Sequence, residues 1–132
     1  TSGSMFSPAQ GTNMSSYSVA KAMALYFSYL LEGKFANTFL EFDSCVKMRD
    51  WGNGTPYQKY HRFQHSYYGS TNFLGVADVF VELKNKGYAE SEFPTGVICI
   101  SDGEFNSSSR KSNTTFEEFK KIIDDINERY YF

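Results

Sequence analysis

Oxygen-bearing side chains gather in three short polar loops of this 132-residue chain, at positions 1–5, 69–72 and 101–105. Their sequences are Thr-Ser-Gly-Ser-Met, Gly-Ser-Thr-Asn and Ser-Asp-Gly-Glu-Phe. The third loop follows the apolar run at 97–100, which is typical of a strand buried on both faces. Ligand sites of open α/β sheets lie in the crevice outside the carboxyl ends of the strands. Hydroxyls and a carboxylate from three loops could form a hard-cation site there.

Helices and strands that alternate along the chain are expected to position these loops. Apolar residues at helical spacing predict helices at about 17–32, 57–64, 73–86 and 116–126. Strand-like runs lie at 35–42, 46–51 and 96–101. This order predicts an α/β fold, with a mainly parallel sheet and helices on both of its faces.

The predicted sheet has too few strands to support the first polar loop. A loop at the carboxyl end of a strand needs that strand directly before it, and residues 1–5 open the given sequence. We therefore expect a central strand before Thr1 and at least one more after Phe132. Residues 1–132 would then be one partial domain of a longer chain.

The composition indicates a globular domain, with 41% apolar and 21% charged residues. A net charge of -2 argues against a mainly electrostatic hold on nucleic acid. The two cysteines, Cys45 and Cys99, are too few for a disulfide framework and are predicted to be reduced and buried. No stretch approaches the roughly 18 to 20 apolar residues of a membrane helix, and no signal peptide is recognisable. We expect an intracellular, cytoplasmic protein with no membrane partner.

The three loops, in this order, resemble the metal-ion-dependent adhesion site (MIDAS) of von Willebrand factor type A (vWA) domains. Residues 1–5 resemble the family's Asp-x-Ser-Gly-Ser-Met loop without its leading Asp. Thr71 resembles the isolated threonine of the site, and Asp102 resembles its second aspartate. The resemblance covers nearly all of the chain. It is closest to an intracellular branch that includes the Ro-type (TROVE) RNA-binding proteins and an uncharacterised plant, fungal and viral family.

The resemblance implies a Rossmann-like vWA fold whose first central strand is missing from this chain, and a metal site made of Ser2, Ser4, Thr71 and Asp102. The metal would be Mg²⁺, with Mn²⁺ or Ca²⁺ as substitutes. The hydroxyls would supply neutral oxygens, and Asp102 would act through a bridging water. Neutral ligands leave the metal electrophilic, so that an open position can take a Glu or Asp carboxylate from a protein partner. The implied function is a non-catalytic protein-interaction module of a larger intracellular protein.

Each of these residues also has a simpler structural interpretation. Ser2 and Ser4 can cap a helix or form a turn, and Thr71 can cap the helix that follows it. Asp102 can cap the turn after the strand. The Gly-Ser-Met sequence at 3–5 also matches a remnant of cloning. Trp51 is interpreted as a packing residue.

A second functional interpretation is a Ro-like ribonucleoprotein scaffold, with RNA bound mainly by an adjacent region. Residues 57–68 interleave basic and aromatic residues, as surfaces that stack on single-stranded RNA do. An amphipathic helix with its aromatic residues on the sheet explains the same pattern, and the net charge favours that explanation. A metal-dependent hydrolase is the weakest hypothesis, because the paired carboxylates of a two-metal site are lacking. His61 and His65 also stand in no catalytic motif.

Overall fold

The computed structural model describes residues 3–8, 11–64, 72–94, 96–101 and 115–126. The α-helices in these ranges are α1 (Ser16–Ser28), α2 (Pro56–Arg62), α3 (Leu74–Asn85) and α4 (Thr115–Ile126). The strands β1 (Thr38–Phe42) and β2 (Val46–Asp50) form one sheet. The short 3-10 helices are η1 (Gly3–Phe6), η2 (Gly33–Phe35) and η3 (Glu90–Glu92).

Helix α1 begins with a side-chain cap at Ser15 and ends earlier than predicted. The Ser15 hydroxyl accepts a hydrogen bond from the Ser18 N–H at 3.1 Å, as expected for an N-cap. The helix ends at Ser28 rather than near residue 32. The Leu30 N–H donates to the Phe27 carbonyl at 2.9 Å, a bond of the 3-10 type. Such bonds tighten the last turn of a helix and satisfy its free carbonyls.

Helices α2 and α3 begin with side-chain caps. The Thr55 hydroxyl accepts from the Gln58 N–H at 3.3 Å, and the Gln58 side chain accepts from the Thr55 N–H at 3.0 Å. Pro56 occupies the first helical position, which needs no N–H donor. The Asn72 side chain accepts from the Gly75 N–H at 3.1 Å. The Thr55 and Asn72 side chains therefore each satisfy a backbone N–H of the first helical turn.

The two strands form an antiparallel hairpin. Phe39 pairs with Arg49, and Phe42 pairs with Val46. The turn is stabilised by Asp43, whose Oδ1 accepts a hydrogen bond from the Cys45 N–H at 3.0 Å. A short turn of this kind can join only antiparallel strands. Both strands were predicted, at nearly these positions.

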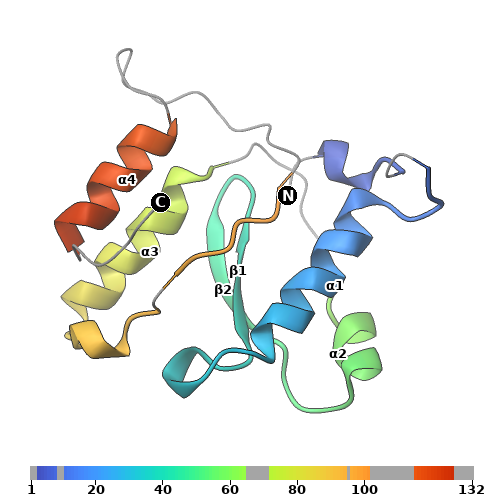
Figure 1. Cartoon of the computed structure of the whole chain (residues 1–132), viewed down its shortest axis with the longest axis horizontal. Helices are drawn as coiled ribbons and strands as arrows, with labels where there is room; N and C mark the ends of the chain where they lie inside the picture. Colours follow the sequence, from blue (N-terminus) through green and yellow to red (C-terminus); the bar gives the residue numbers. More distant parts are fainter. Residues whose placement is uncertain (1–2, 9–10, 65–71, 95, 102–114, 127–132) are drawn as a thin grey trace.

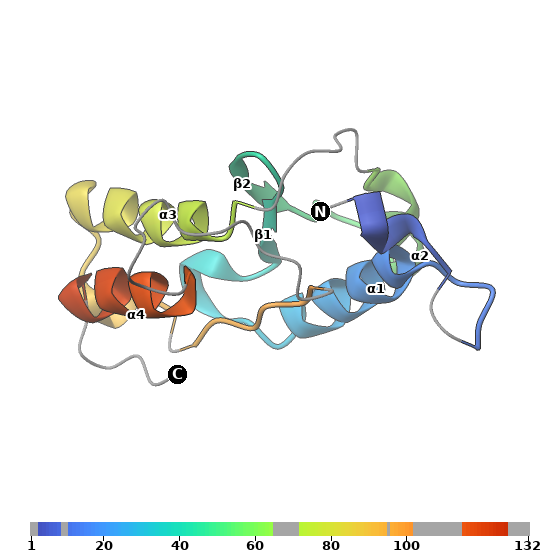
Figure 2. The same cartoon turned by 90° about the horizontal axis from the view of Figure 1, so that it is seen from above.

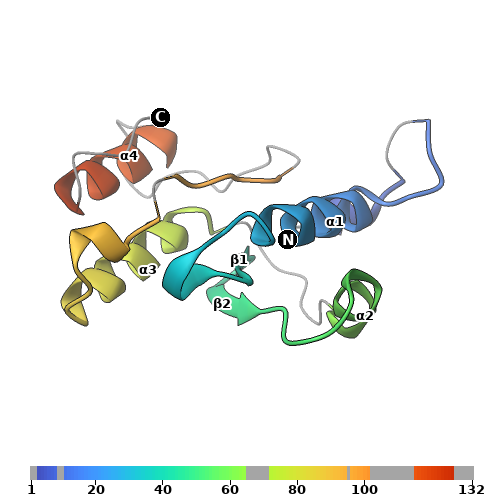
Figure 3. The same ribbon diagram turned by 60° about the horizontal axis from the view of Figure 1, so that its bottom comes forward.

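The helices lie in two groups beside the hairpin. Helices α3 and α4 lie side by side on one side, and α1 and α2 lie on the other (Figures 1 and 2). Figure 3 shows that α2 lies beside α1, away from α4. The buried core is centred on α3 and α4 and consists of Phe73, Val76, Ala77, Phe80, Leu83, Phe93, Phe119 and Ile123.

The predicted mainly parallel sheet is wrong for the part of the chain that the structure describes. The sheet there has two strands, and they are antiparallel. Residues 96–101 form no strand, and the Ile98 side chain is 64% exposed. An apolar run becomes a strand only where a neighbouring strand supplies hydrogen bonds, and β1 pairs only with β2 among the described residues. The expectation of buried cysteines is wrong as well, because Cys45 and Cys99 are both exposed.

Candidate functional site

Three of the four predicted metal ligands, Ser2, Thr71 and Asp102, lie outside the described residues. Ser4 belongs to η1, but its side chain is not among those that the structure describes. The structure therefore leaves this site as a prediction. The described residues next to the three loops show which part of the fold surrounds them.

An apolar groove lies among α1, β1, α3 and the segment 96–101 and has a volume of about 290 Å³. We define the apolar groove by its main walls: Ala20, Ala24, Phe27 and Leu31 of α1, residues 39–42 of β1, Val76, Val79, Phe80 and Leu83 of α3, and residues 96–101. No sequence motif predicted this groove. It arises because segments far apart in the chain leave apolar side chains uncovered at one place.

One described residue in or next to each polar loop lines this groove. Met5 ends the first loop, Phe73 follows the second, and Ser101 opens the third. Met5 and Phe73 are buried. The loops with the predicted oxygen ligands therefore connect to one region of the fold.

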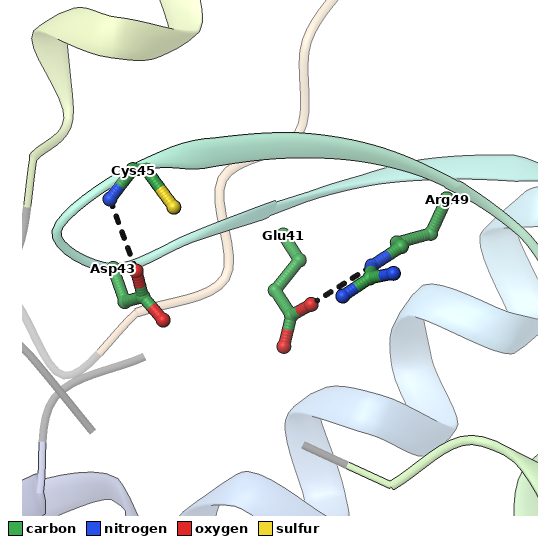
Figure 4. Close-up of polar contacts among 4 residues, drawn as sticks. All are labelled: Glu41, Asp43, Cys45 and Arg49. Atoms are coloured by element: carbon green, nitrogen blue, oxygen red, sulfur yellow. Dashed lines mark hydrogen bonds and ion pairs between the residues drawn. The ribbon is translucent and has the colours of Figure 1, made fainter. Parts of the chain in front are cut away.

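Asp43 ties the second loop to the end of β1. Asp43 is buried, and its carboxylate accepts the hydrogen bond from the Cys45 N–H (Figure 4). Its backbone carbonyl accepts a hydrogen bond from the Asn72 N–H at 2.6 Å. The sequence suggests only that Asp43 closes the strand, as aspartates often do in turns. Its long-range contact with Asn72 could not be seen in any local pattern.

A charged pair lies on the hairpin, at the wall of the groove. The Arg49 Nε donates to Glu41 Oε2 at 3.2 Å (Figure 4). The Glu41 side chain is nearly buried and also lines the apolar groove. The adjacent guanidinium compensates this carboxylate, so that the pair adds little net charge to an apolar wall.

Cys99 is the thiol of the groove. It lines the apolar groove, whereas Cys45 lies in the hairpin turn and is not among the lining residues. Desolvation by the surrounding apolar groups raises the pKa of the Cys99 thiol. The two cysteines can therefore report separately on the groove and on the hairpin turn.

The aromatic and basic residues of α2 differ in their burial and contacts. Tyr57 is 72% exposed, and its ring centroid lies 4.2 Å from that of His61. Lys59 is buried, and its Nζ donates to the Asn37 side chain at 2.5 Å. The expected packing of these aromatic residues on the sheet is thus not found for Tyr57.

The aromatic residues that pack in the fold, Trp51 and Phe63, lie on either side of α2. Trp51 is buried and stacks on Phe39, with ring centroids 4.3 Å apart. Phe63 contacts Trp51 edge-on at 5.5 Å between ring centroids. The Lys21 Nζ lies 4.2 Å from the centroid of the Tyr60 ring, and partial burial lowers its pKa. The prediction that Trp51 is a packing residue is confirmed.

Among the described residues, no group of three or more His, Cys, Asp or Glu side chains is placed to hold a metal ion. None of the described helices has the length and apolar character needed to cross a membrane. No family model, curated protein or solved structure matches the chain.

Proposed function

We propose that this chain is a non-catalytic protein-interaction module of an intracellular protein, in which Mg²⁺ receives a carboxylate from a protein partner. Ser2, Ser4, Thr71 and Asp102 would hold the metal, in keeping with their resemblance to the adhesion site of vWA domains. The observation that carries this proposal is the convergence of Met5, Phe73 and Ser101 on one groove, because each belongs to or follows one of the ligand loops.

The donor set suits a hard divalent cation. Hydroxyl and carboxylate oxygens are the ligands that Mg²⁺ prefers, and Mg²⁺ keeps several waters that a partner's carboxylate can replace. The bound metal would supply a positive charge for that carboxylate. The contact between Asn72 and Asp43 supports the arrangement, since it anchors the residue directly after Thr71 to the end of β1.

Glu41, Asp43 and His61 each have contacts that suit a binding protein better than a catalyst. Asp43 is used in the hairpin turn, and Glu41 is paired with Arg49. His61 lies beside the rings of Tyr57 and Tyr60. A general base must lie within hydrogen-bond reach of the group it activates, and these contacts fit structural roles better.

Calorimetric titration of MgCl₂ into the 132-residue protein tests this function. We expect saturable binding that Asp102→Ala weakens by about tenfold to a hundredfold, the usual cost of losing an outer-shell partner. Acetate, as a mimic of the partner's carboxylate, should tighten metal binding. The matched control is Asp124→Ala, because Asp124 is a carboxylate whose partner is Lys120 on the same helix. Equal binding by both variants, or no binding by the parent, would contradict the proposal.

The second candidate function is the Ro-like scaffold, with RNA held mainly by an adjacent region. It is favoured by one observation, the exposed Tyr57 ring beside His61 on α2. Exposed aromatic rings can stack on unpaired bases. We expect a fluorescent single-stranded RNA to bind this chain weakly, with an affinity that falls steeply with salt. Tyr57→Ala should reduce that affinity further, and no effect of Tyr57→Ala would count against this candidate.

A further inference from the structure

Asn53 is the one asparagine of the sequence that a glycine follows. Its turn, residues 52–54, lies between β2 and α2 at the edge of the molecule (Figures 1 and 3). Asn53 and Gly54 are both exposed, and Gly54 has a φ of 130°. Glycine adopts such a φ without strain, and its lack of a Cβ atom allows other groups to approach its backbone closely.

These two residues carry the groups for an internal ring closure. Asn53 Cγ is an amide carbonyl carbon, and the Gly54 backbone nitrogen can attack it to form a succinimide. Among the described residues, neither the Asn53 side chain nor the Gly54 N–H forms a hydrogen bond. The N–H groups of Gly52 and Thr55, by contrast, donate to side-chain oxygens at 2.6 and 3.0 Å. The turn is therefore anchored on both sides of Asn53 while the two reacting groups stay free.

Two of the other described asparagines precede an N–H group that is already hydrogen-bonded. Asn13 is also exposed, but the N–H of the next residue donates to Thr12 Oγ1 at 3.2 Å. The N–H of the residue after Asn85 donates to the Glu82 carbonyl at 2.9 Å. Attack by either nitrogen would require that its hydrogen bond breaks first.

The remaining two described asparagines have their side chains in hydrogen bonds. The Asn37 Nδ2 donates to Asp50 Oδ1 at 2.9 Å, and the Asn72 Oδ1 accepts from the Gly75 N–H at 3.1 Å. Both side chains are held away from the backbone nitrogen that follows them. Among the described asparagines, Asn53 is therefore the one whose side chain and following N–H are both free.

We propose that Asn53 is a site of spontaneous modification, at which the protein converts its own side-chain amide to a carboxylate. The Gly54 nitrogen forms a bond to Asn53 Cγ, the Cγ–Nδ2 bond breaks, and the Gly54 amide proton leaves with Nδ2 as ammonia. Water then opens the succinimide. Cleavage between the Gly54 nitrogen and Cγ gives aspartate, and cleavage between this nitrogen and the backbone carbonyl carbon gives isoaspartate.

The isoaspartate product changes the connection to α2. Its main chain runs through Cγ, which makes the path from the buried Trp51 to the capping residue Thr55 longer by one carbon. The turn has little room for this change, because a Cβ atom at Gly54 would lie 2.7 Å from Gln58 Oε1. Gln58 is the other half of the α2 capping box. Isoaspartate should therefore weaken this cap, whereas aspartate leaves the backbone path unchanged.

Peptide mapping of the protein during storage tests the proposal. The 132-residue protein is incubated at neutral pH and digested after increasing times. The asparagine, aspartate and isoaspartate forms of each peptide are then separated by chromatography and identified by mass spectrometry. A synthetic peptide with the sequence of residues 51–57 gives the rate in the absence of the fold. Asn53→Gln is the matched control, because glutamine keeps the amide but would have to close a larger ring.

We expect Asn53 to react at a rate within about threefold of that of the peptide, since an exposed turn needs almost no free energy to open. Asn13 should react at least about tenfold more slowly, because the N–H after it is hydrogen-bonded. The rate at Asn53 should rise with pH, because the attacking nitrogen must lose its proton. Asn53→Gln should give no product at position 53 over the same period.

Urea denaturation of the separated products tests the effect on α2. Asn53→Asp is the reference, because it carries the new charge on an unchanged backbone. We expect the isoaspartyl protein to have an unfolding equilibrium constant about fivefold larger than that of Asn53→Asp, which is the usual cost of losing an N-cap.

Three outcomes would overturn the proposal. A rate at Asn53 more than about tenfold below that of the peptide would show that the fold holds the two groups apart. Equal rates at Asn13 and Asn53 would show that exposure decides the reaction and that the geometry of the turn does not. An isoaspartyl protein as stable as Asn53→Asp would exclude the effect on the α2 cap.

Discussion

Similar apolar residues are buried between α3 and α4 but exposed on the side formed by α1 and the segment 96–101, which we call the groove side. On the first side, Phe119 is 1% exposed and packs on Phe73, with ring centroids 4.6 Å apart. On the second side, Leu31 just after α1 is 41% exposed and Ile98 is 64% exposed, and both line the groove. The first side is closed because two amphipathic helices cover each other. The second side lacks such a cover among the described residues, and large exposed apolar areas of this kind mark interaction sites.

Truncating one large apolar side chain on each side should give the largest contrast. We expect Phe119→Ala to lower the free energy of unfolding by about 3–5 kcal/mol, because it leaves a cavity in a closed core. Ile98→Ala should change it by less than about 0.5 kcal/mol, as exposed substitutions do. Urea denaturation followed by circular dichroism measures both values. Similar losses for the two variants would show that the groove side is as well packed as the α3–α4 side.

Gly75 joins the closed side to the hairpin and should give an intermediate effect. A Cβ atom at this position would lie 2.8 Å from Val46 Cγ2 and 2.9 Å from Asn72 Nδ2. Alanine is the better helix former by about 1 kcal/mol, but the overpacking costs about 1–3 kcal/mol. We expect Gly75→Ala to destabilise the protein by up to about 2 kcal/mol in the same urea assay.

A matched variant separates these two contributions. Val46→Ala removes the methyl group that an alanine at position 75 would meet first. The double variant should therefore lose less stability than the sum of the two single variants. Strict additivity would mean that the contact between α3 and β2 is not close.

The smallest effect is expected for the surface ion pair that links the two sides. Lys34 in η2 pairs with Glu92 in η3, and the Glu92 side chain also accepts a hydrogen bond from the Ala89 N–H at 2.8 Å. The Lys34 ammonium, followed by this backbone bond, lowers the pKa of Glu92. A lowered carboxylate pKa contributes stability above the pKa of the unfolded chain. This contribution is lost as the pH falls through the lower pKa of the folded state.

An NMR titration of the Glu92 carboxyl carbon checks this link. Its midpoint should lie below the ordinary value of about 4.3 for glutamate, and Lys34→Met should move it upward. Glu82 serves as the comparison, because its ion pair with Lys86 lies within α3 and spans no gap between elements. An unchanged Glu92 midpoint in Lys34→Met would remove the ion pair from the explanation.

The expected metal site shows how far sequence patterns reach. Ser2, Ser4, Thr71 and Asp102 were predicted as ligands from their residue types, order and neighbours, which are properties of short segments. The apolar groove that Met5, Phe73 and Ser101 share was not foreseen. It depends on the packing of elements separated by tens of residues, and no local pattern encodes it.

The sequence by itself determined the approximate positions of the four helices, the two strands of the hairpin, and the apolar faces of the helices. These features depend on contacts within a few residues, so that composition and spacing suffice to predict them. Only the tertiary structure decided that the β1–β2 pair is antiparallel and that the run at 97–100 stays outside the sheet. The reason is that a helix satisfies its own backbone hydrogen bonds, whereas a strand depends on a neighbour from elsewhere in the fold.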